Sequence, residues 1–250
     1  MKNNKKVTLF GIDIYGFTMS EMVKIIDDSI KNNKKLYQED INAAKVVFYH
    51  KNKFIKKSID MSDYRCADGQ SIVFASKIFG KILPERIAGI DLMQNLIALS
   101  DSKKYKIFLL GSKETIIKAL VKKIRNKYGE DIIVGYRNGY FNKDEEQNII
   151  HKINSSGAHM LFIGIGSPYK EEFISRNLNE INVPFIMGVG GSFDVLSGHI
   201  KRAPLWMQKH GLEWFYRFLK EPKRMFRKAF IINLKFIYMV FEEKLKINKR

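Results

Sequence analysis

Asp68, in the segment "YRCADGQ", is the carboxylate of this sequence best suited to act as a general base. A tight turn between two elements can hold such a side chain at the rim of a crevice, where it takes the proton of an attacking hydroxyl. An enzyme that inverts a sugar centre needs one base of this kind. An isolated Asp-Gly pair is also a common plain turn, and the residues alone favour that simpler interpretation.

Three glycine-rich turns follow predicted strands, so they should meet at one edge of a sheet. They are "LLGSK" (109–113), "GIGSP" (164–168) and "GVGGSFD" (188–194), the last with candidate substrate-binding residues Gly190, Gly191 and Asp194. Glycines let backbone amides approach a diphosphate. The patterns GxGxxG and GxxxxGK[ST] are both absent, which argues against a dinucleotide fingerprint and a P-loop but leaves a sugar nucleotide compatible.

We expect no metal site and no cofactor. The five histidines show no paired ligand spacing, and neither CxxC nor Asp-x-Asp occurs. Cationic side chains would then neutralise a leaving diphosphate, and arginine suits this task because its planar fork pairs with phosphate oxygens. Cys66 is the only cysteine, which excludes an intrachain disulfide and suits a reducing cytoplasm.

The apolar pattern predicts an α/β fold, a Rossmann-like parallel sheet sandwiched by helices. In the second half, expected strands at 106–111, 131–135, 159–166 and 183–191 alternate with helices at 113–127, 144–153 and 168–178. In the first half we expect a strand at 7–14, a helix from a Thr18–Glu21 capping box to Ile30, and a loop followed by a helix within 36–60. A turn at 64–70 and helices at 71–79 and 89–99 should follow.

The C-terminal fifth differs in composition, so we divide the chain into a catalytic domain, residues 1–198, and an appendage, residues 199–250. The net charge is +18, and the appendage supplies +10 of it, with fourteen basic and four acidic side chains. Such a local excess predicts a surface for phosphates or anionic lipid. Both tryptophans, Trp206 and Trp214, also lie there, where packing on the domain explains them as well as lipid contact does.

The last helix has the spacing of an interfacial anchor. Phe226, Phe230, Leu234, Ile237 and Phe241 fall on one predicted apolar stripe. No segment reaches the roughly 20 apolar residues of a membrane span, and the N-terminus reads as a strand rather than a signal peptide. The chain is therefore expected in the cytoplasm, held peripherally on the inner face of the cell membrane. Removing the appendage should leave a folded, more soluble core.

Taken in order, the motifs resemble the WecG/TagA/CpsF family of bacterial glycosyltransferases. The matching segments are "ADG" (67–69), "ERIAGIDL" (85–92), "LLGSK", "NGYF" (138–141), "GIGSPYKE" (164–171), "GVGGSFDVLSG" (188–198) and "RAPLWMQKHGLEWFYRFLKEPKRMFR" (202–227). The resemblance covers nearly the whole chain and implies an inverting, metal-independent enzyme. Its implied substrates are a UDP-sugar and an acceptor N-acetylglucosamine on a polyprenyl diphosphate, in teichoic acid, capsule or other cell-surface polysaccharide synthesis.

The resemblance also implies roles for single residues. Asp68 matches the catalytic base, Asn42 matches an active-site position, and Arg86 matches a residue that faces the diphosphate. The appendage would dock on the membrane and complete the site with arginines. These would be Arg217, Arg224 and Arg227.

Two positions depart from the family's pattern. Asp40 stands where a threonine is usual, and Lys170 replaces the glutamine of "PKQE". A buried charge is less costly when paired, so we expect Asp40 and Lys170 to face each other as a compensated change at the substrate. A lysine at the donor would favour a uronic or other sugar over N-acetylmannosamine.

Two other functions fit parts of the sequence. A non-catalytic sugar-nucleotide-binding scaffold would account for the unusual residues at positions 40 and 170. The presence of Asp68, Asn42 and Arg86 argues against it. Nucleic-acid binding fits the basic composition, but no DNA- or RNA-binding motif occurs. We expect no nucleic-acid partner, and the sequence leaves homo-oligomerisation open.

Overall fold

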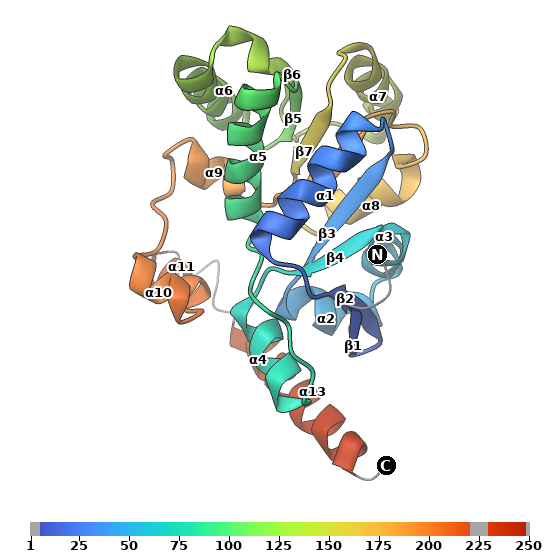
Figure 1. Cartoon of the computed structure of the whole chain (residues 1–250), viewed down its shortest axis with the longest axis vertical. Helices are drawn as coiled ribbons and strands as arrows, with labels where there is room; N and C mark the ends of the chain where they lie inside the picture. Colours follow the sequence, from blue (N-terminus) through green and yellow to red (C-terminus); the bar gives the residue numbers. More distant parts are fainter. Residues whose placement is uncertain (1–5, 221–229, 249–250) are drawn as a thin grey trace.

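One parallel β-sheet organises the chain in the computed structural model, which describes residues 6–220 and 230–248 (Figure 1). Its six strands lie in the order β4-β3-β8-β7-β5-β6, and all neighbouring pairs are parallel. The strands are β3 (Leu36–Ile41), β4 (Tyr64–Ala67), β5 (Ile107–Gly111), β6 (Ile133–Arg137), β7 (Met160–Gly164) and β8 (Phe185–Gly188). The predicted α/β class is confirmed.

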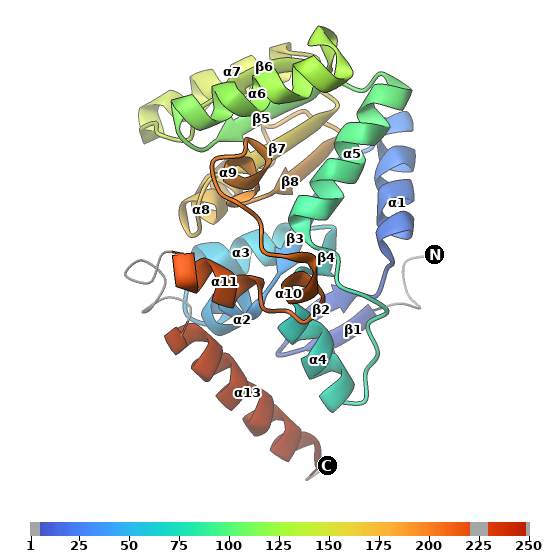
Figure 2. The same ribbon diagram turned by 90° about the vertical axis from the view of Figure 1, so that its left-hand side faces the viewer.

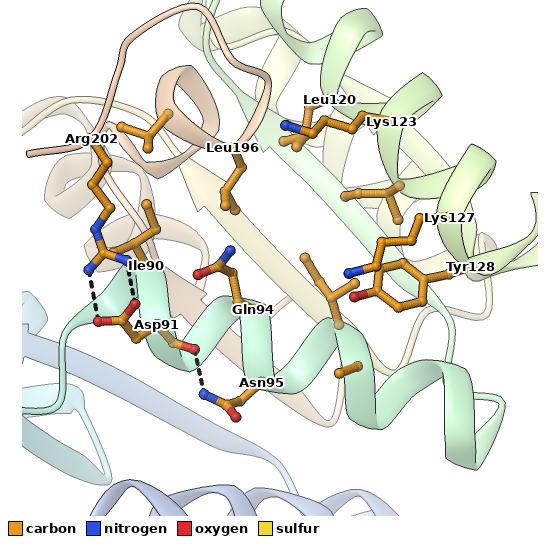
Figure 3. A pocket seen from close by; sticks show the side chains of 14 residues that line it. Ile90, Asp91, Gln94, Asn95, Leu120, Lys123, Lys127, Tyr128, Leu196 and Arg202 are labelled. Carbon is orange, nitrogen blue, oxygen red and sulfur yellow. Dashed lines mark hydrogen bonds and ion pairs between the residues drawn. The ribbon is translucent and has the colours of Figure 1, made fainter. Parts of the chain in front are cut away.

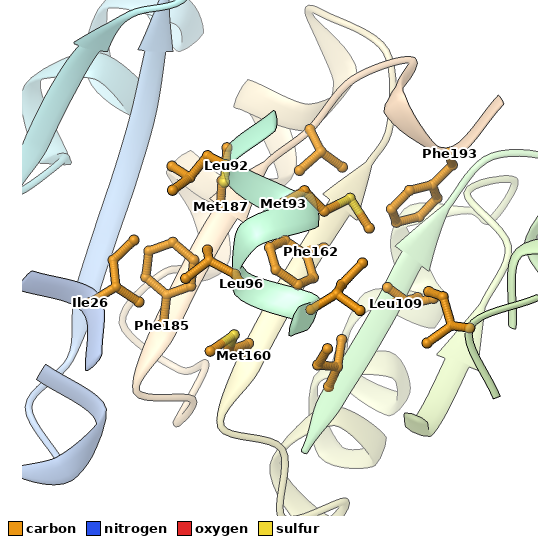
Figure 4. Packing of buried hydrophobic residues seen from close by; sticks show 14 of the residues in the cluster. Ile26, Leu92, Met93, Leu96, Leu109, Met160, Phe162, Phe185, Met187 and Phe193 are labelled. Carbon is orange, nitrogen blue, oxygen red and sulfur yellow. The ribbon is translucent and has the colours of Figure 1, made fainter. Parts of the chain in front are cut away.

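Helices cover both faces of the sheet, as Figure 2 shows from the side. Successive strand residues point to opposite faces, so Leu109 joins one apolar cluster and Phe108 another. The first cluster packs under α1 (Met19–Lys31), α5 (Gly89–Lys103) and α6 (Glu114–Tyr128). Figure 4 shows Leu92, Met93 and Leu96 of α5 against strand side chains such as Phe162. The second packs under α7 (Glu146–Ser155) and α8 (Tyr169–Asn177).

A third apolar cluster lies beside the β3–β4 edge and joins the two ends of the chain. It unites the hairpin of β1 (Lys6–Leu9) and β2 (Ile12–Tyr15) with α2 (Ala43–Tyr49), α3 (Lys53–Met61), α4 (Gln70–Ile78) and α13 (Ile231–Asn248). The Phe10 ring lies 5.5 Å from the rings of both Phe79 and Phe236. The C-terminal helix is therefore packed onto the core, against α2 and the hairpin.

Three elements of the first half differ from the expectation. Residues 36–41, expected in a loop, form β3, and all six are buried between β4 and β8. The turn expected at 64–70 begins with β4, and the strand expected at 7–14 is a hairpin that turns at Phe10 and Gly11 with positive φ. Three polar residues, Gln38, Glu39 and Asp40, interrupt the apolar pattern of β3. They can be buried because Gln38 Nε2 donates to Asp40 and Lys170 donates to Glu39.

The helix start at Thr18 is confirmed. The Thr18 backbone N–H donates to Glu21 Oε2 at 2.8 Å, and the Glu21 N–H donates back to Thr18 Oγ1 at 3.3 Å. The single helix expected within 36–60 is divided into α2 and α3, because the Asn52 side chain caps a new helix start. The remaining predicted helices and the second-half strands lie within a few residues of their expected bounds.

The appendage contains α10 (Leu205–Lys209), α11 (Glu213–Lys220) and α13, after the short α9 (Ser192–Leu196). Helix α13 packs through Phe236 and Val240, not through the predicted stripe. The stripe residues Phe230, Leu234, Ile237 and Phe241 are exposed, and Phe226 lies outside the described residues. Among the helices that the structure describes, none combines the length and the apolar character that crossing a bilayer requires.

Candidate active site

A cleft of about 470 Å³ opens at the carboxyl ends of β3, β4, β7 and β8. From β3 the chain continues to β4 at one edge of the sheet, and strands β5 to β8 all lie on the opposite side of β3. The strand order therefore reverses between β3 and β8, and the cleft lies at this point. The predicted residues that line it are Asp40, Asn42, Asp68, Arg86, Lys170, Gly190 and Gly191. Asp194 lies in α9 and is not among the residues that line the cleft.

Asp68 and Asp40 meet at the N-terminus of α5. The Gly89 N–H donates to Asp68 Oδ1 at 3.0 Å, and Gln38 Nε2 donates to Asp40 Oδ1 at 2.7 Å. A Cβ at position 89 would lie 2.3 Å from Asp40 Oδ2, so only glycine lets the helix start here. The positive end of the helix dipole favours negative charge at this point.

Burial, together with the nearby charge of Asp68, raises the pKa of Asp40 to about 8. Two adjacent carboxyl groups do not both ionise readily, because like charges at close range disfavour the charged form. Asp40 is therefore mostly protonated at neutral pH. It can donate a hydrogen bond to a substrate in the cleft.

Lys170 does not pair with Asp40, so that expectation is wrong. Its ammonium group donates to both Glu39 oxygens at 2.6 and 2.7 Å and lies 3.2 Å from Glu171. Lys45 also pairs with Glu39, and it lies 4.0 Å from Glu171. The result is a buried cluster of two lysines and two glutamates at the floor of the cleft. Lys170 can lie there because Gly188, at the end of β8, has no Cβ; one would be 2.9 Å from the Lys170 stem.

The charges of Glu39 and Glu171 raise the pKa of Lys170, although burial opposes them. Each lysine thus faces carboxylates, and the cluster as a whole carries no net charge. Because residues 36–41 were expected in a loop, no pattern in the sequence placed Glu39 beside Lys170. Lys45 and Glu171 lie in predicted helices and were not singled out, because their partners are on β3 or on another helix.

Arg86 is held by the appendage. Its Nη1 donates to Glu213 Oε2 at 2.7 Å, and Glu213 Oε1 lies 3.2 Å from Arg202 Nε. Arg202 in turn forms two bonds with Asp91, at 2.5 and 2.8 Å (Figure 3). This chain of charges joins the first residues of α11 to the start of α5, and Glu213 itself lines the cleft. Glu213 was not singled out in the sequence, although it lies inside the longest motif.

Asn42 and the glycine turns have clear local roles. Asn42 caps α2, where its Oδ1 accepts from the Lys45 N–H at 3.1 Å. Gly190 adopts a φ of +49°, a left-handed conformation that glycine takes without strain. Both residues line the cleft, so the backbone of the α2 start and of the turn after β8 lies beside it.

The appendage arginines cannot be placed in the same way. Arg217 lies in α11, but its side chain is outside the described part of the chain, and so are Arg224 and Arg227 entirely. The appendage reaches the cleft through Gly211, Glu213, Ile232 and Asn233. A Cβ at Gly211 would lie 2.7 Å from Gln70, so the appendage and the start of α4 are in close contact.

A second cavity, of about 580 Å³, lies between α5, α6 and α9 (Figure 3). None of the predicted site residues lines it. Within residues 6–220 and 230–248, no three His, Cys, Asp or Glu side chains are grouped so that they could hold a metal ion. The groups that can perform acid–base and phosphate chemistry therefore converge in the cleft at the carboxyl edge of the sheet.

A parallel sheet with a carboxylate, an arginine and glycine turns at its carboxyl edge defines an α/β enzyme of the kind that binds its ligand at a strand-order reversal. The pattern of the glycosyl transferase WecG/TagA/CpsF family matches residues 7–250, and the chain belongs to that family. The protein is thus a glycosyltransferase, which moves a sugar from a donor to an acceptor. Its family is linked to the synthesis of cell-surface polysaccharides.

Proposed function

We propose that this enzyme transfers an uncharged sugar from a UDP donor to an N-acetylglucosamine-type acceptor on a polyprenyl diphosphate. The observation that carries the proposal is the position of Asp68 in the cleft, where Gly89 orients its carboxylate. A carboxylate held in this way can take the proton of the acceptor hydroxyl as the hydroxyl attacks the anomeric carbon. A single displacement inverts that carbon and releases UDP.

Arg86 would stabilise the negative charge that develops on the leaving UDP. It is paired with Glu213 in the structure, so a diphosphate entering the cleft competes with a carboxylate for the same guanidinium. Arg217, Arg224 and Arg227 of the appendage would add further positive charge. The reaction would then need no metal ion, and turnover should persist in the presence of EDTA.

The charges in the cleft favour an uncharged donor sugar such as N-acetylmannosamine. Glu39 and Glu171 neutralise Lys170, so this lysine is no free cation for a uronic acid. The Asp68 carboxylate would repel a sugar carboxylate. A protonated Asp40 would instead donate to a sugar hydroxyl or acetamido oxygen.

The acceptor lipid places the reaction at the inner face of the cell membrane. We propose that residues 199–250 dock there and that residues 1–198 form the catalytic domain. The exposed apolar stripe of α13 supports this arrangement, because interfacial helices bury such a stripe among lipid head groups. The net positive charge of the appendage suits an anionic leaflet.

The test is UDP release from a panel of UDP-sugars, with and without a short-chain, water-soluble acceptor bearing N-acetylglucosamine on a lipid diphosphate. We expect acceptor-dependent release from one uncharged donor. Release from a UDP-uronic acid alone would contradict the charge argument. UDP binding without release from any donor would favour a non-catalytic scaffold.

A further inference from the structure

Exposed apolar side chains are concentrated on the appendage and on α4 with the segment after it. Figures 1 and 2 both show α4 and α13 side by side, at the end that carries the C-terminus. Among the described residues, all exposed large apolar side chains lie on α4, the segment just after it, or the appendage, except four. The exceptions are Phe48, Tyr136, Tyr140 and Tyr169.

Helix α4 belongs to the catalytic domain, yet its outer face is apolar. Phe74 and Ile78 lie four residues apart on the helix and are 50% and 48% exposed, and Ile82, in the segment that follows α4, is 78% exposed. The opposite face, with Ile72 and Val73, is buried in the core. Packing therefore explains the inner face but not the outer one, and a contiguous apolar surface of this kind typically marks a binding surface.

We propose that the outer face of α4 is a second membrane-contacting element, which enters the same lipid head-group region as α13. The inference rests on the proposed function and extends it from the appendage to the catalytic domain. Exposed Lys77 and Lys81 lie between the three apolar residues in the sequence; the Lys81 ammonium group donates to the Thr8 carbonyl at 2.8 Å, and Lys77 supplies a cation beside Phe74 and Ile78. An anionic bilayer surface offers both partners at once.

The position of α4 connects this contact to the chemistry. The helix follows Asp68 directly, and Gly69 and Gln70 at its start line the cleft. Its nine residues span about 13 Å at 1.5 Å per residue. With its far end in the head groups, α4 would hold Asp68 at a fixed height above the lipid surface, where the diphosphate-linked acceptor projects.

The contact can be tested with single labelled cysteines. Cys66 is fully buried, and burial raises the pKa of its thiol, so an introduced surface cysteine can be labelled selectively. We would attach an environment-sensitive fluorophore in the variants Ile78→Cys, Phe241→Cys and Tyr140→Cys. Vesicles of phosphatidylcholine with phosphatidylglycerol would be added to the full-length proteins, and vesicles of phosphatidylcholine alone would show the charge dependence.

We expect blue-shifted emission at positions 78 and 241 with anionic vesicles and no shift at position 140. A shift at 241 alone would mean that the appendage docks without α4 and would overturn the inference. A shift at all three positions would indicate unspecific adsorption and would overturn it as well. No shift at any position would contradict the proposed membrane docking itself, which separates the two failures.

A second variant measures the contribution of α4 to binding. Phe74→Ser with Ile78→Ser should weaken partitioning into anionic vesicles by about tenfold, because two apolar side chains no longer enter the head groups. Turnover with the water-soluble acceptor should stay unchanged, which shows that the cleft is intact. Tyr140→Ser, which removes a side chain that is 69% exposed elsewhere, is the matched control for binding. Unchanged partitioning of the double variant would contradict the inference.

Discussion

At the scale of single residues, the floor of the cleft combines two adjacent carboxyl groups in different surroundings with a buried cluster of two lysines and two glutamates. Asp68 accepts from the α5 N-terminus, whereas burial favours a proton on its neighbour Asp40. When the surroundings of two carboxyl groups differ in this way, one site can contain both a base and a hydrogen-bond donor. The two carboxyl groups and the ion cluster lead to three predictions.

Asp68→Asn should lower turnover by about 100-fold or more, since an amide cannot take the acceptor's proton. The amide keeps an oxygen for the Gly89 N–H, so the loop should stay in place. UDP affinity, measured by calorimetry, should remain close to that of the wild type. Near-normal turnover would remove Asp68 from the mechanism.

Lys170→Gln should lower the free energy of unfolding by about 3–5 kcal/mol, because it leaves a carboxylate buried without its partner. Adding Glu39→Gln should recover part of the loss, since one lysine and one glutamate then remain. Adding Asp40→Thr should recover little, because Lys170 is not paired with Asp40. Chemical denaturation of the three variants compares these outcomes, and rescue by Asp40→Thr alone would contradict the observed pairing.

The raised pKa of Asp40 predicts how stability changes with pH. Between about pH 4 and pH 8 the folded protein keeps a proton that the unfolded chain has released, so this group's contribution to stability falls as pH rises. Asp40→Asn lacks the effect. The melting temperature of the variant, relative to wild type, should therefore rise from pH 5 to pH 8, and a constant difference would contradict the shifted pKa.

At the scale of elements, α13 has two apolar faces with different tasks. Phe236 is 4% exposed and packs against Phe10, whereas Phe241, about one turn further on, is 67% exposed. The predicted stripe was thus a correct description of an apolar face, but this face does not pack on the core. A helix that is apolar on both sides needs a partner on each, unlike an ordinary surface helix.

Phe236→Ala should destabilise the fold by about 3 kcal/mol, as large-to-small changes in a core do. Phe241→Ala should change stability by less than about 0.5 kcal/mol but weaken binding to anionic vesicles. Denaturation and vesicle flotation of both variants separate the two faces. Equal losses of stability would mean that the exposed face also has a structural partner.

At the scale of the whole molecule, the appendage is tied to the catalytic domain at two places. The Arg86–Glu213–Arg202–Asp91 chain holds α11, and the Phe10–Phe236 contact holds α13. The division at residue 198 therefore separates two parts of the sequence that differ in composition. The third apolar cluster contains residues from both parts.

A chain that ends at residue 198 should be less stable than the full-length protein, since Phe10 and Phe79 lose a covering side chain. Its affinity for anionic vesicles should fall strongly, with the remainder due to α4. Thermal unfolding and flotation of this variant test both points. Undiminished vesicle binding would contradict docking by the appendage.

Local patterns in the sequence determined the second-half strands, most of the helices, the basic appendage and the motifs that relate the chain to its family. These features follow from side-chain periodicity, capping and charge, which act over a few neighbouring residues. Asp68 could be named as a site candidate from its Asp-Gly turn, whereas Asn42 and Arg86 were named from the resemblance to the family.

Only the tertiary structure decided which charged and polar side chains pair with one another. The strand Leu36–Ile41 is buried with three polar residues, which no local pattern predicts, because their partners come from α2, α8 and the neighbouring loops. The pairing of Lys170 with Glu39 joins residues 131 positions apart, and that of Arg86 with Glu213 joins residues 127 apart. Burial and pairing depend on which elements fold together, so charge alone in the sequence could not assign them.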